Sequence, residues 1–326
     1  MKIYDRNYLI LTIKNIILSL IKFFVINIPF LYKILYFLPS KKIIYFDENQ
    51  TKKSSRLSLM FVFLARFNKS KDIISKQVRY KSTSINFNLN LDINEYTQCG
   101  YYFHESNNDL INLIKLGGDV FIDIGANIGF FTIIAAQKFN NVLSFEPTPI
   151  SLSHLRDNIK LNEIENIEIF ECALSDKLGR LNLNVNPLNS GGNSLNNFSS
   201  SMIEKSSRND WTSFDVDVKT LDNILLNKKI TINSLDLLKI DIEGHEVPAL
   251  KGSINTISKY KPLIYAEVGR SKGNMDKILE ILPKYYSPFY ISQLEIIEFK
   301  QGSVPMDILF VPNDKLDIIR KKLKQS

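Results

Sequence analysis

Hydrophobic and polar residues alternate in blocks along most of the chain after residue 105, and these blocks have the lengths of short strands and helices. Five apolar runs are typical of strands buried on both faces, as in a parallel sheet covered by helices: 119–125, 141–146, 167–173, 235–241 and 262–267. Helices are expected at 105–116, 150–161 and 247–259. With later strands near 286–291 and 307–311, this order predicts an α/β fold with right-handed crossovers.

Residues 1–94 have a different pattern and are expected to form a mainly helical extension that also contains strands, which the alternation in 78–91 predicts. The segment 8–38 is the most apolar, but three lysines interrupt it and Pro29 divides it. It therefore lacks the ~18–20 consecutive apolar residues of a membrane span. Two short amphipathic helices broken near Pro29 are expected instead. They either pack on the following domain or lie in a membrane interface with their lysines toward anionic head groups.

Residues 95–326 are expected to form one domain with a single insertion. The inserted stretch, 186–213, is rich in Asn, Ser and Gly and lies between two alternating segments, 179–185 and 214–218, that are expected to be strands. A polar stretch of this length predicts a loop or a lid over a binding site.

The run 119–125 ends in a pattern that predicts a nucleotide-binding crevice. Asp123 is expected at the carboxyl end of the strand, Gly125 allows a tight turn, and Gly129 allows close approach of the next helix. Glu146 ends the following strand, where an acidic side chain is well placed to accept both hydroxyls of a bound ribose.

Details of this turn distinguish two kinds of cofactor. A dinucleotide fold requires G-x-G-x-x-G so that backbone N–H groups can hold a pyrophosphate, but Asn127 and Phe130 occupy the last two glycine positions. Asp123 would also repel a diphosphate. A carboxylate here suits a cationic ligand such as S-adenosylmethionine, with its sulfonium and ammonium groups. The alternative is an ordinary turn between strand and helix that binds no nucleotide.

Composition narrows the class of partner and the compartment. The 326 residues are 44% hydrophobic, which is enough for a sizeable core. A net charge of +7 permits an anionic partner such as a membrane surface, a nucleotide sugar or nucleic acid. No internal basic block carries the interleaved aromatic residues of an RNA-binding surface, so nucleic acid is disfavoured. Two cysteines, Cys99 and Cys172, indicate neither a disulfide framework nor a zinc cluster, which fits a reducing cytosol.

Acidic residues follow the predicted strands of the central sheet, at the edge where open α/β sheets bind ligands. They are Asp123, Glu146, Asp176, then Asp241 with Glu243 and Glu246, and Glu267. A single carboxylate at a strand end is commonly a helix cap or a surface charge. Five acidic strand ends together indicate a site.

Five motifs, in this order, resemble those of the FkbM-type methyltransferases: Phe121-Ile-Asp-Ile-Gly-Ala-Asn-Ile-Gly129, Phe145-Glu146-Pro147, Ala173-Leu-Ser-Asp176, Thr220-Leu-Asp222 and Leu238-Lys-Ile-Asp-Ile-Glu-Gly-His-Glu246. The resemblance covers about residues 95–270. It implies a class I methyltransferase fold, in which a Rossmann-like, mostly parallel sheet has an antiparallel final strand and flanking helices. It also implies S-adenosylmethionine as cofactor and O-methylation of a sugar or secondary metabolite.

The resemblance assigns cofactor-binding roles as well. Residues around the methionine part would be Asp123, Gly125, Ala126, Asn127 and Gly129, with Asp241 nearby. By the same resemblance, Glu146 would hold the ribose, and Ser175 and Asp176 would border the adenine.

Methyl transfer to oxygen needs in-line positioning and removal of a proton from a weakly acidic alcohol, so a base or a metal is expected. His245 is a candidate base because its reference pKa is near neutrality; the alternative is a structural histidine near a helix N-terminus. Asp241, Glu243 and Glu267 are candidates for catalysis and for binding a divalent cation such as Mg²⁺, which would orient a sugar diol and lower its hydroxyl pKa. Their structural alternative is capping of the helix that begins near Glu246.

The expected function is therefore S-adenosylmethionine-dependent O-methylation of a sugar, nucleotide-sugar or lipid-linked glycan in the cytoplasm. Peripheral contact with the inner face of a membrane through residues 8–38 would suit a lipid-linked acceptor. Two alternatives are a catalytically silent S-adenosylmethionine-binding or scaffold module of a glycan assembly complex, and an RNA methyltransferase.

Overall fold

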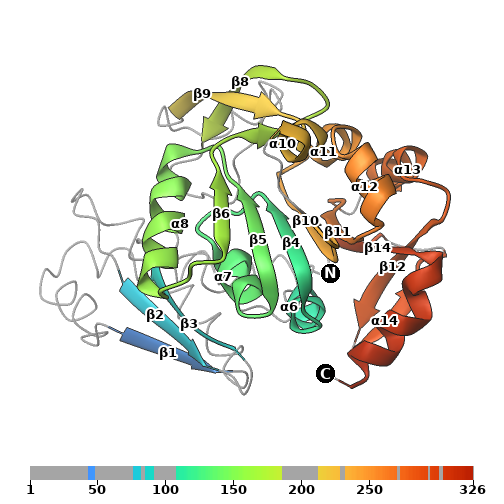
Figure 1. The fold of residues 1–326 in the computed structure, drawn as a ribbon, viewed down its shortest axis with the longest axis horizontal. Helices are drawn as coiled ribbons and strands as arrows, with labels where there is room; N and C mark the ends of the chain where they lie inside the picture. The colour runs from blue at the N-terminus through green and yellow to red at the C-terminus, as the bar shows by residue number, and fades with distance from the viewer. Residues whose placement is uncertain are drawn as a thin grey trace, which may run out of the picture.

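The computed structural model describes residues 43–47, 76–81, 85–91, 108–185, 212–227, 232–269, 272–292, 294–300 and 304–325. An eight-stranded sheet forms the centre of this part (Figure 1). From one edge to the other its strands are β13 (Glu295–Glu298), β12 (Tyr286–Ser292), β14 (Asp307–Pro312), β11 (Leu263–Glu267), β10 (Leu237–Ile240), β4 (Gly118–Ile124), β5 (Phe139–Phe145) and β6 (Ile167–Phe170).

Strand direction in this sheet confirms the predicted class I methyltransferase arrangement. The five strands from β11 to β6 are parallel to one another. The last strand in the chain, β14, lies antiparallel between β11 and β12, and β13 adds a further antiparallel edge. Chain order runs outward from β4 through β5 to β6 and then returns to β10 on the other side of β4. Ligands bind at such a reversal, beyond the carboxyl ends of the strands.

Helices cover both faces of the sheet because successive strand residues point to opposite sides. On one face, α6 (Asn108–Lys115), α7 (Phe130–Ala136) and α14 (Leu316–Leu323) pack around Phe121 and Leu309. The opposite face packs around Ile122 and Phe310 and carries α10 (Leu221–Asn227), α11 (Glu246–Lys251), α12 (Ile254–Tyr260) and α13 (Lys272–Ile281). α8 (Pro149–Leu161) follows β5, and a short 3-10 helix (Asn313–Lys315) precedes α14.

Two predicted elements are each divided in the structure. The strand expected at 167–173 ends at Phe170, whose carbonyl accepts the N–H of Cys172 in a tight turn. The chain then enters a second sheet of β7 (Ala173–Leu174), β9 (Thr212–Lys219) and β8 (Gly179–Val185). The helix expected at 247–259 is α11 and α12, which meet at Gly252. A Cβ on Gly252 would lie 1.9 Å from the carbonyl oxygen of Ser175, so only glycine permits this approach.

The N-terminal part contributes a three-stranded sheet of β1 (Ile43–Asp47), β2 (Lys76–Lys81) and β3 (Asn86–Leu91), so the strands expected within 78–91 are present. Side chains of β3 join the core formed by α6 and α7. The helices expected within 8–38, the domain boundary at 94/95 and nearly all of the insertion 186–213 lie outside the described residues.

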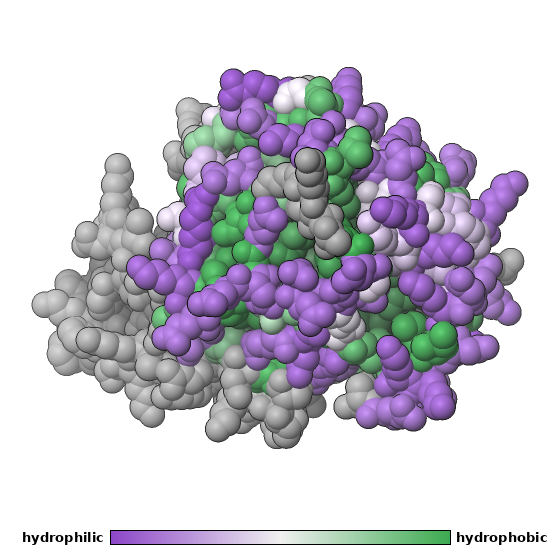
Figure 2. All heavy atoms as spheres, in the orientation of Figure 1, coloured by the Kyte–Doolittle hydropathy of each residue, from purple (hydrophilic) through white to green (hydrophobic). Residues whose placement is uncertain are grey.

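Hydrophilic side chains cover much of the face seen in Figure 2, as expected where amphipathic helices pack on a sheet. Among the described residues, no helix combines the length and the apolar character needed to cross a membrane.

Candidate active site

The turn after β4 (residues 125–129, the glycine turn) is held between the ends of two neighbouring strands. Gly125 has a φ of +83°, in the left-handed region that favours glycine. A Cβ at this position would lie 2.0 Å from the carbonyl oxygen of Asp241, at the end of β10. On the other side, the N–H groups of Gly125 and Ala126 each donate to the carbonyl of Phe145 at 3.0 Å. The turn therefore cannot move independently of β5 and β10.

The far end of the glycine turn approaches α8. Gly129 has a φ of +93°, and a Cβ there would lie 2.6 Å from Cδ1 of Leu155. Asn127 also adopts a positive φ, 49°, and its Oδ1 accepts a hydrogen bond from Ser151 at 3.0 Å. The residues singled out by the sequence motif thus have specific backbone roles.

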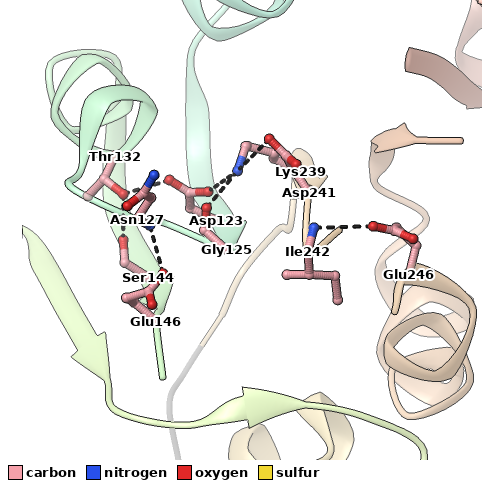
Figure 3. Close-up of polar contacts among 10 residues, drawn as sticks. All are labelled: Asp123, Gly125, Asn127, Thr132, Ser144, Glu146, Lys239, Asp241, Ile242 and Glu246. Carbon is pink, nitrogen blue, oxygen red and sulfur yellow. Dashed lines mark hydrogen bonds and ion pairs between the residues drawn. The ribbon is translucent and has the colours of Figure 1, made fainter. Parts of the chain in front are cut away.

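Asp123 lies beneath the glycine turn and does not face outward. Its side chain is fully buried, Oδ2 accepts from Thr132 Oγ1 at 2.6 Å, and Oδ1 accepts from Lys239 Nζ at 3.0 Å (Figure 3). Thr132 Oγ1 lies 3.0 Å from Ser144 Oγ in turn. The charge of Asp123 is thus paired inside the protein, where it supports the turn from below; a direct contact with a cationic ligand stays a prediction.

Lys239, which the sequence analysis did not single out, lies at the centre of these contacts. Its ammonium also donates to the carbonyl of Gly125 at 2.9 Å and lies 3.9 Å from Oδ2 of Asp241 (Figure 3). Burial acts to lower the pKa of Lys239, but the carboxylates of Asp123 and Asp241 outweigh it and raise the pKa above its ordinary value. The signal in the sequence was a single lysine inside the apolar strand β10.

Glu146 lies at the end of β5 beside the glycine turn. Its Oε2 accepts the N–H of Asn127 at 2.9 Å, and its Oε1 accepts the N–H of Thr148 at 2.9 Å and also the hydroxyl of Thr148. Burial raises the pKa of Glu146, and these hydrogen bonds partly oppose the rise. Since a carboxylate oxygen can accept two hydrogen bonds, Oε2 retains capacity for a ligand hydroxyl.

Ser175, Asp176 and His245 come together where β7 meets α11. Ser175 Oγ donates to Oδ1 of Asp176 at 3.2 Å and lies 3.0 Å from Nε2 of His245. In the second contact, either the serine hydroxyl or Nε2 is the donor, depending on the tautomer of His245. Burial lowers the pKa of His245, which favours the neutral ring, and Nδ1 is buried with no hydrogen-bond partner in the part of the chain that the structure describes.

Asp241, Glu243 and Glu267, here called the acidic cluster, are brought together from β10 and β11. One carboxylate oxygen from each lies within 4.8 Å of the others. Burial, and then the charge of Asp241, raise the pKa of Glu243 to about 7 and that of Glu267 to about 9. Glu243 has a positive φ of 53°, a conformation that non-glycine residues adopt mainly where the surrounding structure requires it.

Two further carboxylates near the acidic cluster were missed by the sequence analysis. Asp307 of β14 pairs in register with Glu267, and burial, then Asp241, raise its pKa to about 7. Asp109 on α6 has a pKa raised by burial to about 6, and its charge contributes to the rise at Asp307.

Glu246, the first residue of α11, binds the loop that precedes this helix. The side chain of Glu246 accepts the N–H groups of Ile242 and Gly244 at 3.2 and 3.0 Å and so closes the loop after β10. His245 occupies the N-cap position of α11 without a side-chain capping hydrogen bond.

The sheet order, the glycine turn and the carboxylates at the carboxyl ends of β4, β5, β10 and β11 define a class I methyltransferase domain. The methyltransferase FkbM domain matches residues 123–288, half of the chain, and the protein belongs to this family.

Similar curated proteins include the methyltransferase sdnD of Sordaria araneosa, 29% identical over 152 residues, which are 40% of this chain and 59% of that protein. Another is the 2-O-methyltransferase NoeI of Sinorhizobium fredii, 26% identical over 54% of this chain and 76% of that protein. A third is the hexuronic acid methyltransferase AglP of Haloferax volcanii, 27% identical over 43% of this chain and 52% of that protein. The chain thus spans just over half the length of sdnD.

Proposed function

We propose that this protein is an S-adenosylmethionine-dependent O-methyltransferase that acts on a hydroxyl of a sugar, glycan or glycolipid precursor. The observation that carries the proposal is the glycine turn packed against the end of β10, because this contact brings the turn directly beside the acidic cluster. Membership of the FkbM family supports the same donor.

The described residues fit the donor in three places. The glycine turn would surround its methionine part, Glu146 would accept a ribose hydroxyl through Oε2, and Ser175 with Asp176 would border the adenine. Asp241 is the residue of the acidic cluster that also contacts the glycine turn, through its carbonyl oxygen. Its side chain is 32% exposed, so it can meet a ligand.

The donor supplies the methyl group: its C–S bond breaks, a C–O bond forms on the acceptor, and S-adenosylhomocysteine is released. The protein must align the acceptor oxygen and take its proton. We assign proton removal to Asp241, since its carboxylate is partly exposed and lies at the end of β10 beside the glycine turn. Glu267, with a pKa of about 9, is protonated at neutral pH and can donate a hydrogen bond to the acceptor. His245 is the weaker candidate, because its Nε2 already contacts Ser175.

A divalent cation is a second candidate for activating the acceptor. Three convergent carboxylates are the oxygen ligands that Mg²⁺ accepts, and the separation of their oxygens within 4.8 Å suits shared coordination. When bound, the cation would orient a sugar diol and lower its hydroxyl pKa. Titration calorimetry with Mg²⁺ and Mn²⁺ tests this: binding by the wild type and not by Glu267→Gln supports the site, whereas full activity after exhaustive chelation contradicts it.

The name of AglP, a hexuronic acid methyltransferase, supports a sugar-type acceptor, and the name of NoeI, a 2-O-methyltransferase, supports transfer to oxygen. We propose further that the acceptor is nucleotide-linked or lipid-linked and that the protein works in the cytoplasm, where residues 8–38 would bring it to the inner face of a membrane. A membrane-pelleting assay on the full chain and on a variant lacking residues 1–40 tests the contact. Equal pelleting of the two would contradict it.

Transfer of a labelled methyl group tests the function directly. Wild-type protein is incubated with labelled S-adenosylmethionine and separate panels of free sugars, nucleotide sugars, lipid-linked glycans and RNA, and the products are identified by mass spectrometry. Label in a sugar hydroxyl supports the proposal. Donor binding without transfer to any panel would favour the silent binding or scaffold module, and label in RNA would favour an RNA methyltransferase.

A further inference from the structure

Lys239 is a buried cation that joins the two halves of the proposed site. Its ammonium contacts Asp123 and the carbonyl of Gly125 on the β4 side, and it faces Asp241 at the end of its own strand (Figure 3). The side chain is 4% exposed and passes by the ring of Phe131, whose centroid lies 5.6 Å from Nζ. Lys239 is therefore enclosed by the protein and would not touch a ligand.

The ammonium of Lys239 lies against three different groups of the site. It donates two short hydrogen bonds of 3.0 and 2.9 Å, to Asp123 and Gly125. The third side of the ammonium faces Oδ2 of Asp241 at 3.9 Å, an ion-pair distance that leaves this carboxylate free to meet a ligand. Neutralisation of Asp123 alone would need only the first contact.

We propose that Lys239 is a positioning residue for the amino-acid end of the methyl donor. It fixes the carbonyl of Gly125 and the direction of the Asp241 carboxylate, and these flank the place where the ammonium and carboxylate of the donor would lie. This inference rests on the proposed function, because it assumes that S-adenosylmethionine occupies the glycine turn. The adenine and ribose ends, near Ser175 and Glu146, lie outside the direct contacts of Lys239.

Two ligands that differ only at the amino-acid end separate this role from a general structural one. S-adenosylhomocysteine carries the aminocarboxypropyl group, and 5′-methylthioadenosine has a methyl group in its place. Loss of a residue that positions the amino-acid end weakens the binding of S-adenosylhomocysteine selectively. General damage to the sheet edge weakens the binding of both ligands.

Removal of Lys239 alone would leave Asp123 as an unpaired buried charge, so the test uses a background without that charge. Binding of both ligands is measured by calorimetry for Asp123→Asn and for Asp123→Asn with Lys239→Met. We expect the added Lys239→Met to weaken the binding of S-adenosylhomocysteine at least tenfold and the binding of 5′-methylthioadenosine less than threefold. Lys251→Met, on the exposed side of α11, is the matched control and is expected to change neither.

An unchanged affinity for S-adenosylhomocysteine on adding Lys239→Met would overturn the inference, because Lys239 would then serve only to neutralise Asp123. An equal loss of affinity for both ligands would overturn the inference as well. Wild-type protein that binds neither ligand would instead contradict the proposed function itself.

Discussion

The ammonium nitrogen of Lys239 lies 3.0 Å from Oδ1 of Asp123, and both side chains are almost completely buried between β10 and β4. The two residues are 116 positions apart in the chain. Their pairing allows two charges to remain inside the sheet edge, each with hydrogen-bond partners that offset the loss of solvation.

This pairing predicts how stability responds to charge removal. Lys239→Met leaves the carboxylate of Asp123 buried without its cation, and breaking a buried pair in this way costs about 3–5 kcal/mol of the free energy of unfolding. Replacing both partners, with Asp123→Asn added, is expected to recover most of that loss. Urea unfolding of the single and double variants checks the prediction, and a double variant as unstable as Lys239→Met would contradict it.

Gly125 provides a second prediction. Gly125→Ala would place a Cβ 2.0 Å from a backbone oxygen that cannot move aside, at a φ of +83°. We expect a loss of more than about 1 kcal/mol of stability and loss of S-adenosylmethionine binding. The control is Gly179→Ala in β8, where no atom lies within 4 Å of the added Cβ and a change within about 0.5 kcal/mol is expected. Thermal melts with and without the ligand compare the two variants.

Glu267 predicts a pH dependence of stability. Its pKa in the folded protein is about 9, above the ordinary 4.5, so the folded state binds more protons than the unfolded state between these values. Its contribution to stability is therefore fully present below about pH 4.5 and is lost as the pH rises toward 9. Glu267→Gln removes this loss, and its melting temperature relative to wild type should increase steadily from pH 5 to pH 9. A constant difference across that range would mean that Glu267 titrates normally.

A further prediction concerns Asp241 as the base that removes the proton of the acceptor. Asp241→Asn keeps the shape of the side chain but cannot take a proton, so turnover of the acceptor identified in the panels should fall by at least about 100-fold, the smaller end of general-base contributions. S-adenosylmethionine should still bind measurably, because the glycine turn and Glu146 remain. Wild-type turnover by this variant would exclude Asp241 as the base, and calorimetry on the same preparation shows whether the donor site is intact.

The central sheet could be predicted from the sequence because β4, β5, β10 and β11 are mainly apolar, and each has a carboxylate at or next to its carboxyl end. Lys239 could not be assigned a role in this way: a lysine in such a run finds its partners only when β10 pairs with β4. Asp109 and Asp307 were missed for a similar reason. They lie before and after the motif region. The antiparallel pairing of β14 with β11 brings Asp307 opposite Glu267, and the packing of α6 brings the charge of Asp109 close enough to act on Asp307.

The division of the run 167–173 also depends on long-range contacts. Its residues all have strand character, but Ala173 pairs with Val218 of β9, 45 positions away, and leaves the main sheet. Sequence periodicity identifies a strand and does not identify its partner.

The carboxyl groups of Asp109, Asp241, Glu243, Glu267 and Asp307 gather on one side of the described site, and those that are ionised at neutral pH make this side negative, although the whole chain has a net charge of +7. On an acceptor that carries a diphosphate, as proposed above, the phosphates would be repelled by the ionised carboxylates. A nucleotide-linked or lipid-linked sugar would therefore enter with its uncharged hydroxyl end first and keep its phosphates toward solvent. The polarity of the site would then select which end of the acceptor is methylated.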